Sequence, residues 1–164
     1  MSHDAAASGR DAKLPPLTVR AGPRDTEWPA RHREELVTLI AAVTANRAAD
    51  REWYTLTCDD TGTRWTGTCW AFHANLRYQF DLLLTLPVTY PQAPPTVSLP
   101  GLTGRTAKMY RDGAICQTVH FEPAWARAAP RWGVAHALAA GLGPWLAAEL
   151  PDLVARGVVA EFVQ

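Results

Sequence analysis

Residues Arg64–Pro87, RWTGTCWAFHANLRYQFDLLLTLP, decide the fold that this chain can adopt. They contain two runs, Arg64–His73 and Tyr78–Pro87, in which side chains alternate with the period of a β-strand. In the second run, every other residue is bulky and apolar: Tyr78, Phe80, Leu82, Leu84 and Leu86. We therefore predict two neighbouring strands of a sheet that has one face against a core.

The chain on both sides of this pair extends the predicted sheet. Trp53–Cys58 is rich in aromatic residues and threonine, and the turn signal Asp59–Gly62 would join it to the next strand as a hairpin. Beyond the second run, the prolines of Tyr90–Pro95 make a rigid turn, and Thr96–Leu99 follows as a short fourth strand. We expect a four-stranded antiparallel meander.

An amphipathic helix is predicted before the sheet, over Trp28–Ala48. Its apolar residues recur at spacings of three and four, which is typical of a helix with one buried face. They are Leu36, Leu39, Ile40 and Val43. Arg31 and Glu35 fall elsewhere on this helix, where we expect a solvated surface. Asp25 or Thr26 is expected to cap the first turn.

Helices are also predicted after the sheet. Trp132–Glu149 is mostly apolar and reads as a helix that Gly141–Pro144 divides or kinks, because proline interrupts the backbone hydrogen bonds of a helix. Leu153–Val163 is predicted as a final short helix. The order of one helix, four strands, a loop and further helices is that of an α+β domain.

The composition restricts the class of protein. A chain of 164 residues with 48% hydrophobic residues suits one domain, which we place at residues 21–164 behind a mobile N-terminal extension of residues 1–20. The formal net charge of zero argues against binding nucleic acid or an anionic membrane through bulk charge. No apolar run is long enough to span a bilayer, and residues 1–13 lack the apolar core of a secretory signal. We expect a cytoplasmic protein.

Three cysteines are present, Cys58, Cys69 and Cys116, and no pair has the spacing of a zinc site. Cys58 and Cys69 lie in predicted strands, where we expect small buried side chains. Cys116 lies instead in residues 106–123, TAKMYRDGAICQTVHFEP, a stretch that glycine and proline make unsuitable for a regular helix or strand. We interpret Cys116 as a nucleophile in an accessible loop; the alternative is a buried structural thiol.

Polar residues around Cys116 are candidates for supporting its chemistry. Lys108 is one of only two lysines among sixteen basic residues, and its charge would favour a thiolate. Thr106 either orients this loop by hydrogen bonding or is a turn residue. Asp112 and His120 are the nearby candidates to take a proton from an attacking amine, although a turn residue and a loop-stabilising histidine are the plainer readings.

Tyr110 is expected to pack under the loop. His120 would share a face with Cys116 only if the four residues between them were helical.

Seven short runs between residues 21 and 153 resemble the family of conjugating enzymes for the ubiquitin-fold modifier, a branch of the ubiquitin-conjugating enzyme superfamily. They are Ala21–Asp25 (AGPRD), Gly62–Trp65 (GTRW), Thr89–Pro91 (TYP), Thr106–Arg111 (TAKMYR), Trp125–Arg127 (WAR), Gly141–Leu146 (GLGPWL) and Pro151–Leu153 (PDL). The resemblance implies the α+β fold of ubiquitin-conjugating enzymes. It implies that Thr106–Lys108 stands where most of that superfamily carries His-Pro-Asn.

The same resemblance implies an activity. Cys116 would accept the modifier from its activating enzyme as a thioester and, with a ligase, pass it to lysines of substrate proteins. Lys108 would stabilise the negative charge that develops on the thioester oxygen. No metal, nucleotide or organic cofactor is implied. Neither a nucleic acid nor direct membrane insertion is implied; we expect a monomer that ligase partners recruit to the endoplasmic reticulum surface.

Two other functions stay open from the residues themselves. One is a catalytically inactive binding module of the same fold. The other is a cysteine hydrolase that uses Cys116 and His120, although no third residue is evident to orient the histidine.

Overall fold

The structure, a computed structural model, describes residues 14–110, 112–117 and 119–162. Its elements follow one another along the chain as helix, four strands and helices. They are α2 (Trp28–Ala48), β1 (Tyr54–Cys58), β2 (Arg64–His73), β3 (Leu76–Thr85), β4 (Thr96–Ser98), the short turn η1 (Pro100–Leu102), α3 (Phe121–Ala128), α4 (Val134–Ala137), η2 (Leu138–Leu142) and α5 (Gly143–Ala155). This is the predicted α+β order.

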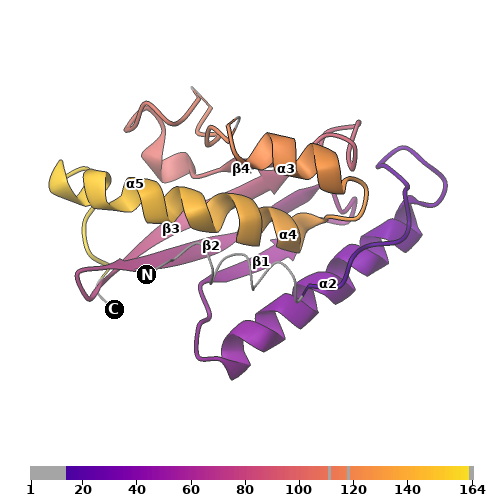
Figure 1. Ribbon diagram of the computed structural model, residues 1–164, viewed down its shortest axis with the longest axis horizontal. Helices are drawn as coiled ribbons and strands as arrows, with labels where there is room; N and C mark the ends of the chain where they lie inside the picture. Colours follow the sequence, from indigo (N-terminus) through magenta and orange to yellow (C-terminus); the bar gives the residue numbers. More distant parts are fainter. Residues whose placement is uncertain (1–13, 111, 118, 163–164) are drawn as a thin grey trace.

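The four strands form one antiparallel sheet in the order β1-β2-β3-β4, as the sequence predicts (Figure 1). Its register places Trp65 opposite Leu84 and Cys69 opposite Phe80. These side chains point to the same face and are buried, as are the alternating apolar residues of β3. The prediction that one face of β3 lies against the core is therefore confirmed.

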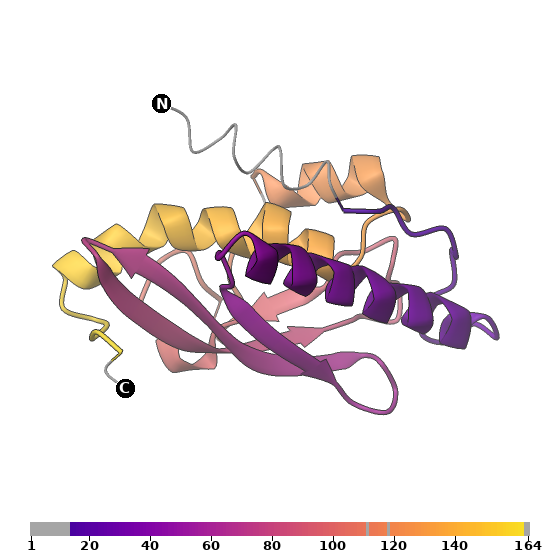
Figure 2. The same cartoon turned by 90° about the horizontal axis from the view of Figure 1, so that it is seen from below.

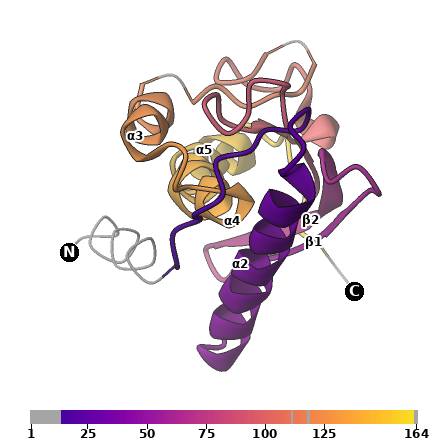
Figure 3. The same cartoon turned by 90° about the vertical axis from the view of Figure 1, so that its right-hand side faces the viewer.

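Helices cover that face of the sheet. α5 packs on β2, and α2 packs on α4. Figure 2 shows the strands beneath α5, with α3 further from the sheet, and Figure 3 shows the same order from the side. None of the helices among the described residues has the length and apolar character that crossing a membrane requires.

The buried face of α2 differs from the one expected. Ile40 is 63% exposed, whereas Arg31 and Glu35 are almost completely buried. The predicted apolar stripe was wrong at Ile40 because α2 turns Arg31 and Glu35 toward the interior instead. Backbone carbonyl groups lie there, and buried carbonyl groups require hydrogen-bond donors. The expected cap was also wrong: α2 has Glu27 at its N-cap with no side-chain hydrogen bond, and Asp25 accepts one from Gly22 instead.

Arg31 and Glu35 together connect four segments of the chain. The Arg31 guanidinium donates to the carbonyls of three residues: Val19, Pro130 and Trp132. Glu35 accepts from Arg31 Nε at 3.1 Å, from the Tyr90 hydroxyl and from Val134 N at 2.8 Å. Burial raises the pKa of Glu35, and the Arg31 charge opposes that rise.

Residues 17–19, which belong to the expected N-terminal extension, lie against the rest of the domain. Leu17 is 3% exposed, and its N–H donates to Arg131 O at 2.8 Å. The N–H groups of Thr18 and Val19 both donate to the Glu34 carboxylate. Residues 1–13, the first part of the expected mobile extension, lie outside the described residues.

The C-terminal helices also depart from the prediction. Gly141–Pro144 does not divide the helix, because the chain passes through η2, a wider π-helical turn, and Pro144 falls in the first turn of α5, where no donor is needed. The predicted helix at Leu153–Val163 was wrong: α5 ends at Ala155, and Gly157 follows with φ of +70°.

Sequence reasoning missed α3. The loop was expected to continue to Pro123, but α3 begins at Phe121 with Pro123 in its first turn, where proline is tolerated. Its inner side chains, Phe121 and Trp125, are buried, so tertiary packing rather than local propensity secures this short helix.

Candidate active site

The Cys116 segment is attached to the outer edge of the sheet. Ser98 of β4 forms a bridge with Ala114, and Ile115 N donates to Val97 O at 2.9 Å. Just before this bridge the chain turns at Gly113, which has φ of +84°, a conformation that favours glycine. Backbone hydrogen bonds therefore attach the segment to β4, although it does not form a regular strand.

Residues 108–110 fold back along residues 114–116. Met109 forms a bridge with Ile115, Tyr110 N donates to Ala114 O at 2.7 Å, and Cys116 N donates to Lys108 O at 2.8 Å. This antiparallel register sets Lys108 opposite Cys116. Side chains of opposed residues lie on one face of such a pairing, with β-carbons about 5 Å apart. The folding back that the sequence analysis assumed for this loop is thus present in the structure.

Tyr110 shares that face. Its hydroxyl lies 3.8 Å from Cys116 Sγ, within reach of a weak thiol hydrogen bond. The hydrogen bond with Cys116, and negative charge on that residue, raise the pKa of Tyr110. The expectation that Tyr110 packs under the loop was wrong, since 51% of it is exposed. Alternation along the hairpin sends the side chain of Met109 inward instead.

Helix α5 holds the Lys108 side of the hairpin. Trp145 Nε1 donates to Lys108 O at 3.2 Å, and the Thr106 hydroxyl donates to Glu149 Oε2 at 3.3 Å. Thr106 also accepts from Lys108 N at 3.2 Å. Trp145 and Glu149 are four residues apart and so lie on one face of α5.

Thr106 therefore makes a hydrogen bond of each kind considered for it: one links the loop to α5, and the other closes a turn. Glu149 was not among the residues singled out from the sequence. The sequence offered only one indication of its role: Glu149 follows Trp145 by four residues, so the two share a face of the predicted helix.

Asp112 lies in the turn of this hairpin, and His120 lies further along the chain, at the start of α3. Asp112 Oδ1 accepts from Ala114 N at 3.1 Å, as a turn residue does. His120 is exposed at the N-cap of α3. Residues 116 and 117 are not helical, so the condition under which His120 would share a face with Cys116 is not met.

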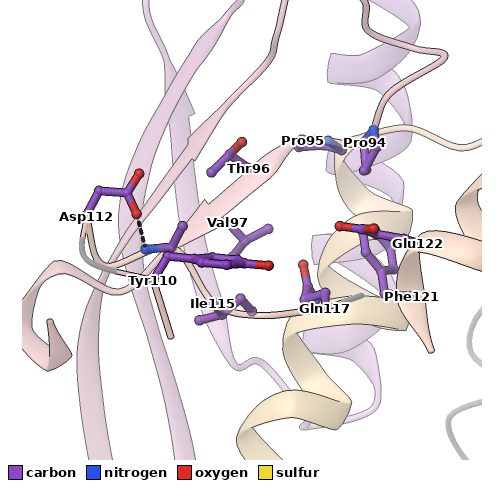
Figure 4. A pocket seen from close by; sticks show the side chains of 11 residues that line it. Pro94, Pro95, Thr96, Val97, Tyr110, Asp112, Ile115, Gln117, Phe121 and Glu122 are labelled. Atoms are coloured by element: carbon purple, nitrogen blue, oxygen red, sulfur yellow. Dashed lines mark hydrogen bonds between the residues drawn. The ribbon is translucent and has the colours of Figure 1, made fainter. Parts of the chain in front are cut away.

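An open groove of about 250 Å³ is lined by Ile115 and Gln117, the two neighbours of Cys116 in the chain (Figure 4). Cys116 itself is half-buried and is not among the lining residues. The floor and far wall of the groove are mostly apolar, formed by Pro94, Pro95, Val97, Ile115 and Phe121. Its polar rim is formed by Tyr110, Asp112, Gln117 and Glu122. Tyr110 connects the groove to Cys116: its side chain lines the groove, and its hydroxyl lies 3.8 Å from Cys116 Sγ.

The other two cysteines lie elsewhere. Cys69 is fully buried in β2, and burial raises its pKa to about 12. Cys58 is less buried than predicted and lies 3.3 Å from His32 Nε2; burial and the neighbouring Asp59 carboxylate raise its pKa. Both thiols are thereby kept protonated, which is unsuited to nucleophilic attack.

Among the residues that the structure describes, there is no group of three or more His, Cys, Asp or Glu side chains that could hold a metal ion.

Comparison with known proteins shows the family to which this chain belongs. The model of the family described as ubiquitin-fold modifier-conjugating enzyme 1 matches residues 9–160. Proteins of that name from Trichoplax adhaerens and Danio rerio are 53% and 52% identical to this chain over 149 residues, which is 90% of this chain and 89% and 90% of theirs. The protein of that name from Rattus norvegicus is 50% identical over the same length, 90% of this chain and 89% of its own. The chain belongs to the ubiquitin-fold modifier-conjugating enzyme family.

Proposed function

We propose that this chain receives the ubiquitin-fold modifier from its activating enzyme as a thioester on Cys116 and, with a ligase, transfers it to lysines of substrate proteins. The names of its relatives support the conjugating activity. The observation that carries the assignment to Cys116 is its position: it is half-buried between two groove-lining residues, Ile115 and Gln117, and its Sγ lies 3.8 Å from the hydroxyl of Tyr110, which also lines the groove.

Two exchanges at the carbonyl carbon make up the reaction. In loading, the Cys116 thiolate attacks the thioester of the activating enzyme; a new S–C bond forms, and the thiolate of the activating enzyme leaves. In discharge, a lysine nitrogen attacks the Cys116 thioester, an N–C bond forms, the amine loses a proton, and the Cys116 thiolate leaves. Each exchange passes through a tetrahedral intermediate with negative charge on oxygen.

Lys108 is the residue proposed to stabilise that charge. Its exposed ammonium group extends from the position opposite Cys116 and can turn toward an oxygen bonded to the reacting carbon. Thr106 supports this role by holding Lys108 N in a turn and anchoring that turn to Glu149.

Asp112 and His120 are the candidates to take the proton from the attacking amine, because both are exposed beside the site. Asp112 also lines the groove.

Two other classes of function are less favoured. An inactive binding module has no use for a half-buried thiol beside a groove, and the relatives are named as enzymes. A cysteine hydrolase would need His120 held against Cys116, but His120 is exposed at the start of α3.

The expected partners follow from the proposed reaction: the modifier, its activating enzyme, a ligase and substrate proteins with accessible lysines. We propose that the enzyme acts as a monomer in the cytoplasm and that ligase partners recruit it to the endoplasmic reticulum surface.

A loading assay tests the proposal. The protein is mixed with the modifier, its activating enzyme and ATP, and the products are separated with and without a reducing agent. An adduct that the reducing agent removes, and that Cys116→Ala does not form, supports the proposal. Cys69→Ala is the matched control and should still load. A reducing-agent-sensitive adduct that persists in Cys116→Ala would overturn the assignment.

A further inference from the structure

Gln117, directly after Cys116, has a buried amide group that the chemistry above does not use. Its side chain lines the groove between Ile115 and the Phe121–Glu122 pair (Figure 4). Its Nε2 atom is inaccessible to solvent and has no hydrogen-bond partner among the described residues. Buried amide groups are normally paired, so an unpaired one next to the nucleophile needs an explanation.

The amide nitrogen occupies a slot that exists because residue 141 is glycine. A β-carbon at Gly141 would overlap Gln117 Nε2 and would lie 3.2 Å from the Phe121 ring. Gly141 belongs to η2, the π-helical turn that replaces the expected helix break. Such turns are frequent at functional sites, where they displace backbone to make room for a side chain.

The carboxamide has two orientations that fit the same slot. Turning it over about its last bond exchanges the oxygen and the NH₂ group without moving the rest of the side chain. In the orientation of this structure the NH₂ group faces Gly141, where it lacks an acceptor. In the other orientation it would face the groove, where an acyl chain attached to Cys116 would bring carbonyl oxygens. The NH₂ group is thus available to a carbonyl group of a chain held on Cys116.

We propose that Gln117 binds the loaded acyl chain: its NH₂ group turns out of the Gly141 slot and donates a hydrogen bond to a carbonyl oxygen of the chain held on Cys116. The inference rests on the proposed function, since it requires the thioester on Cys116. The position of Tyr110 supports this inference. Its side chain lines the same groove as Gln117, and its hydroxyl lies 3.8 Å from Cys116 Sγ, so the sulfur is close to the groove. The hydrogen bond breaks no covalent bond; it holds the thioester still while an amine approaches.

The alternative is that the Gln117 side chain only fills space. The variant Gln117→Met distinguishes this space-filling role from the binding role. Methionine is unbranched and of similar length, so it can fill the slot, but it has no donor. The substitution also removes the unpaired buried NH₂ group. Burying such a group without a partner destabilises the folded protein, so its removal should not lower the Tm. A space-filling role therefore predicts unchanged or raised Tm with unchanged activity. A binding role predicts unchanged or raised Tm with slower transfer.

The experiment follows discharge of preloaded modifier onto free lysine in a single turnover, beside the Tm of each protein. We expect Gln117→Met to lower the discharge rate about tenfold, which is less than the roughly 10²- to 10³-fold lost with an oxyanion-hole donor, because the carboxamide holds the chain and not the reacting oxygen. The KM for lysine should stay the same, because the amine does not contact the carboxamide. Gln92→Met is the matched control, since Gln92 is exposed and does not line the groove. Discharge by Gln117→Met within twofold of the wild-type rate would overturn the inference.

A second measurement needs no change at residue 117, and so it decides the case if Gln117→Met does not fold. The ¹⁵N NMR signal of the Gln117 side-chain NH₂ should shift when Cys116→Ser carries the modifier as a stable ester. An unchanged signal would contradict the hydrogen bond. Failure of wild-type Cys116 to load at all would instead contradict the proposed function, so the two failures are distinguishable.

Discussion

Lys108 and Cys116 are eight residues apart in the chain, yet one backbone hydrogen bond of 2.8 Å sets them opposite each other. The sequence indicated both residues as candidates, because a lysine is rare in this arginine-rich chain and the cysteine lies among glycine and polar residues. It did not give their register, which depends on the pairing of Met109 with Ile115 and on the attachment of Ala114 to β4. These are contacts between segments, and local propensity does not encode them.

Replacing Lys108 tests its proposed role at the scale of one residue. Lys108→Ala should slow discharge onto free lysine about tenfold or more, because a charge that stabilises the intermediate is lost. Loading should be slowed less, since the activating enzyme contributes its own groups to that step. Rates are measured in single turnovers for each step separately.

Arg105→Ala is the control for general loss of positive charge beside the site, since Arg105 is exposed and its contact with Arg156 uses only its backbone carbonyl. Equal discharge rates in wild type and Lys108→Ala would remove Lys108 from the mechanism. An equal loss in Arg105→Ala would reduce its role to bulk charge.

At the scale of elements, α5 positions the hairpin that carries the site. Trp145 and Glu149 reach the loop from one face of α5, and Arg156 adds a hydrogen bond of 2.9 Å to Arg105 O. The sequence predicted most of this helix but broke it at Gly141–Pro144. Glycine and proline are local signals of interruption, whereas the buried side chains of α4, η2 and α5 all belong to one hydrophobic core, which favours a continuous helix.

Trp145→Phe tests this support. It removes the donor to Lys108 O and keeps most of the ring, so the free energy of unfolding should fall by only about 1 kcal/mol. Discharge should be slowed several-fold, because Lys108 loses one of its anchors. Ala148→Ser, at an exposed position of the same helix, is the control and should leave discharge unchanged. Wild-type discharge by Trp145→Phe would show that α5 does not position the loop.

The strands were the best predicted elements, and the N-terminal helix shows why the remainder was harder. Alternation in β2 and β3 follows directly from one buried face, and the sequence placed Arg64–His73 correctly to the residue. On α2 the same logic assigned charged residues to solvent. Arg31 and Glu35 are inside because segments far along the chain, at Pro130–Val134, supply carbonyl and N–H groups that only such side chains can pair.

For the whole molecule, the buried Arg31–Glu35 pair joins α2 both to the N-terminal segment and to the chain before α4. Arg31→Met should lower the free energy of unfolding by about 3–5 kcal/mol, because it leaves the Glu35 carboxylate and several carbonyls buried without their donor. Arg33→Met, on an exposed position of the same helix, should change it by less than about 0.5 kcal/mol. Denaturant unfolding measures both. Similar values for the two variants would mean that the buried pair does not hold these segments together.

His136 makes stability depend on pH. Burial lowers its pKa from 6.5 to about 4, and the nearby Arg31 charge adds to the effect. A histidine whose folded pKa is depressed stabilises the protein above its unfolded pKa, and that contribution is lost as the pH falls toward the folded value.

We therefore expect the free energy of unfolding to fall from pH 6.5 to pH 4, with up to about 3 kcal/mol of that loss due to His136. His136→Gln should show a smaller decrease over the same range in denaturant titrations. Parallel pH curves for the two proteins would refute this assignment.

The central claim is that the modifier is carried on the sulfur of Cys116. Mass spectrometry of the loaded protein, digested without a reducing agent, locates the linkage directly. We predict that the modifier's C-terminal residue is joined to the peptide that contains Cys116 and is released from it by a thiol. A linkage at Cys58 or at a lysine, with the Cys116 peptide unmodified, would contradict the account.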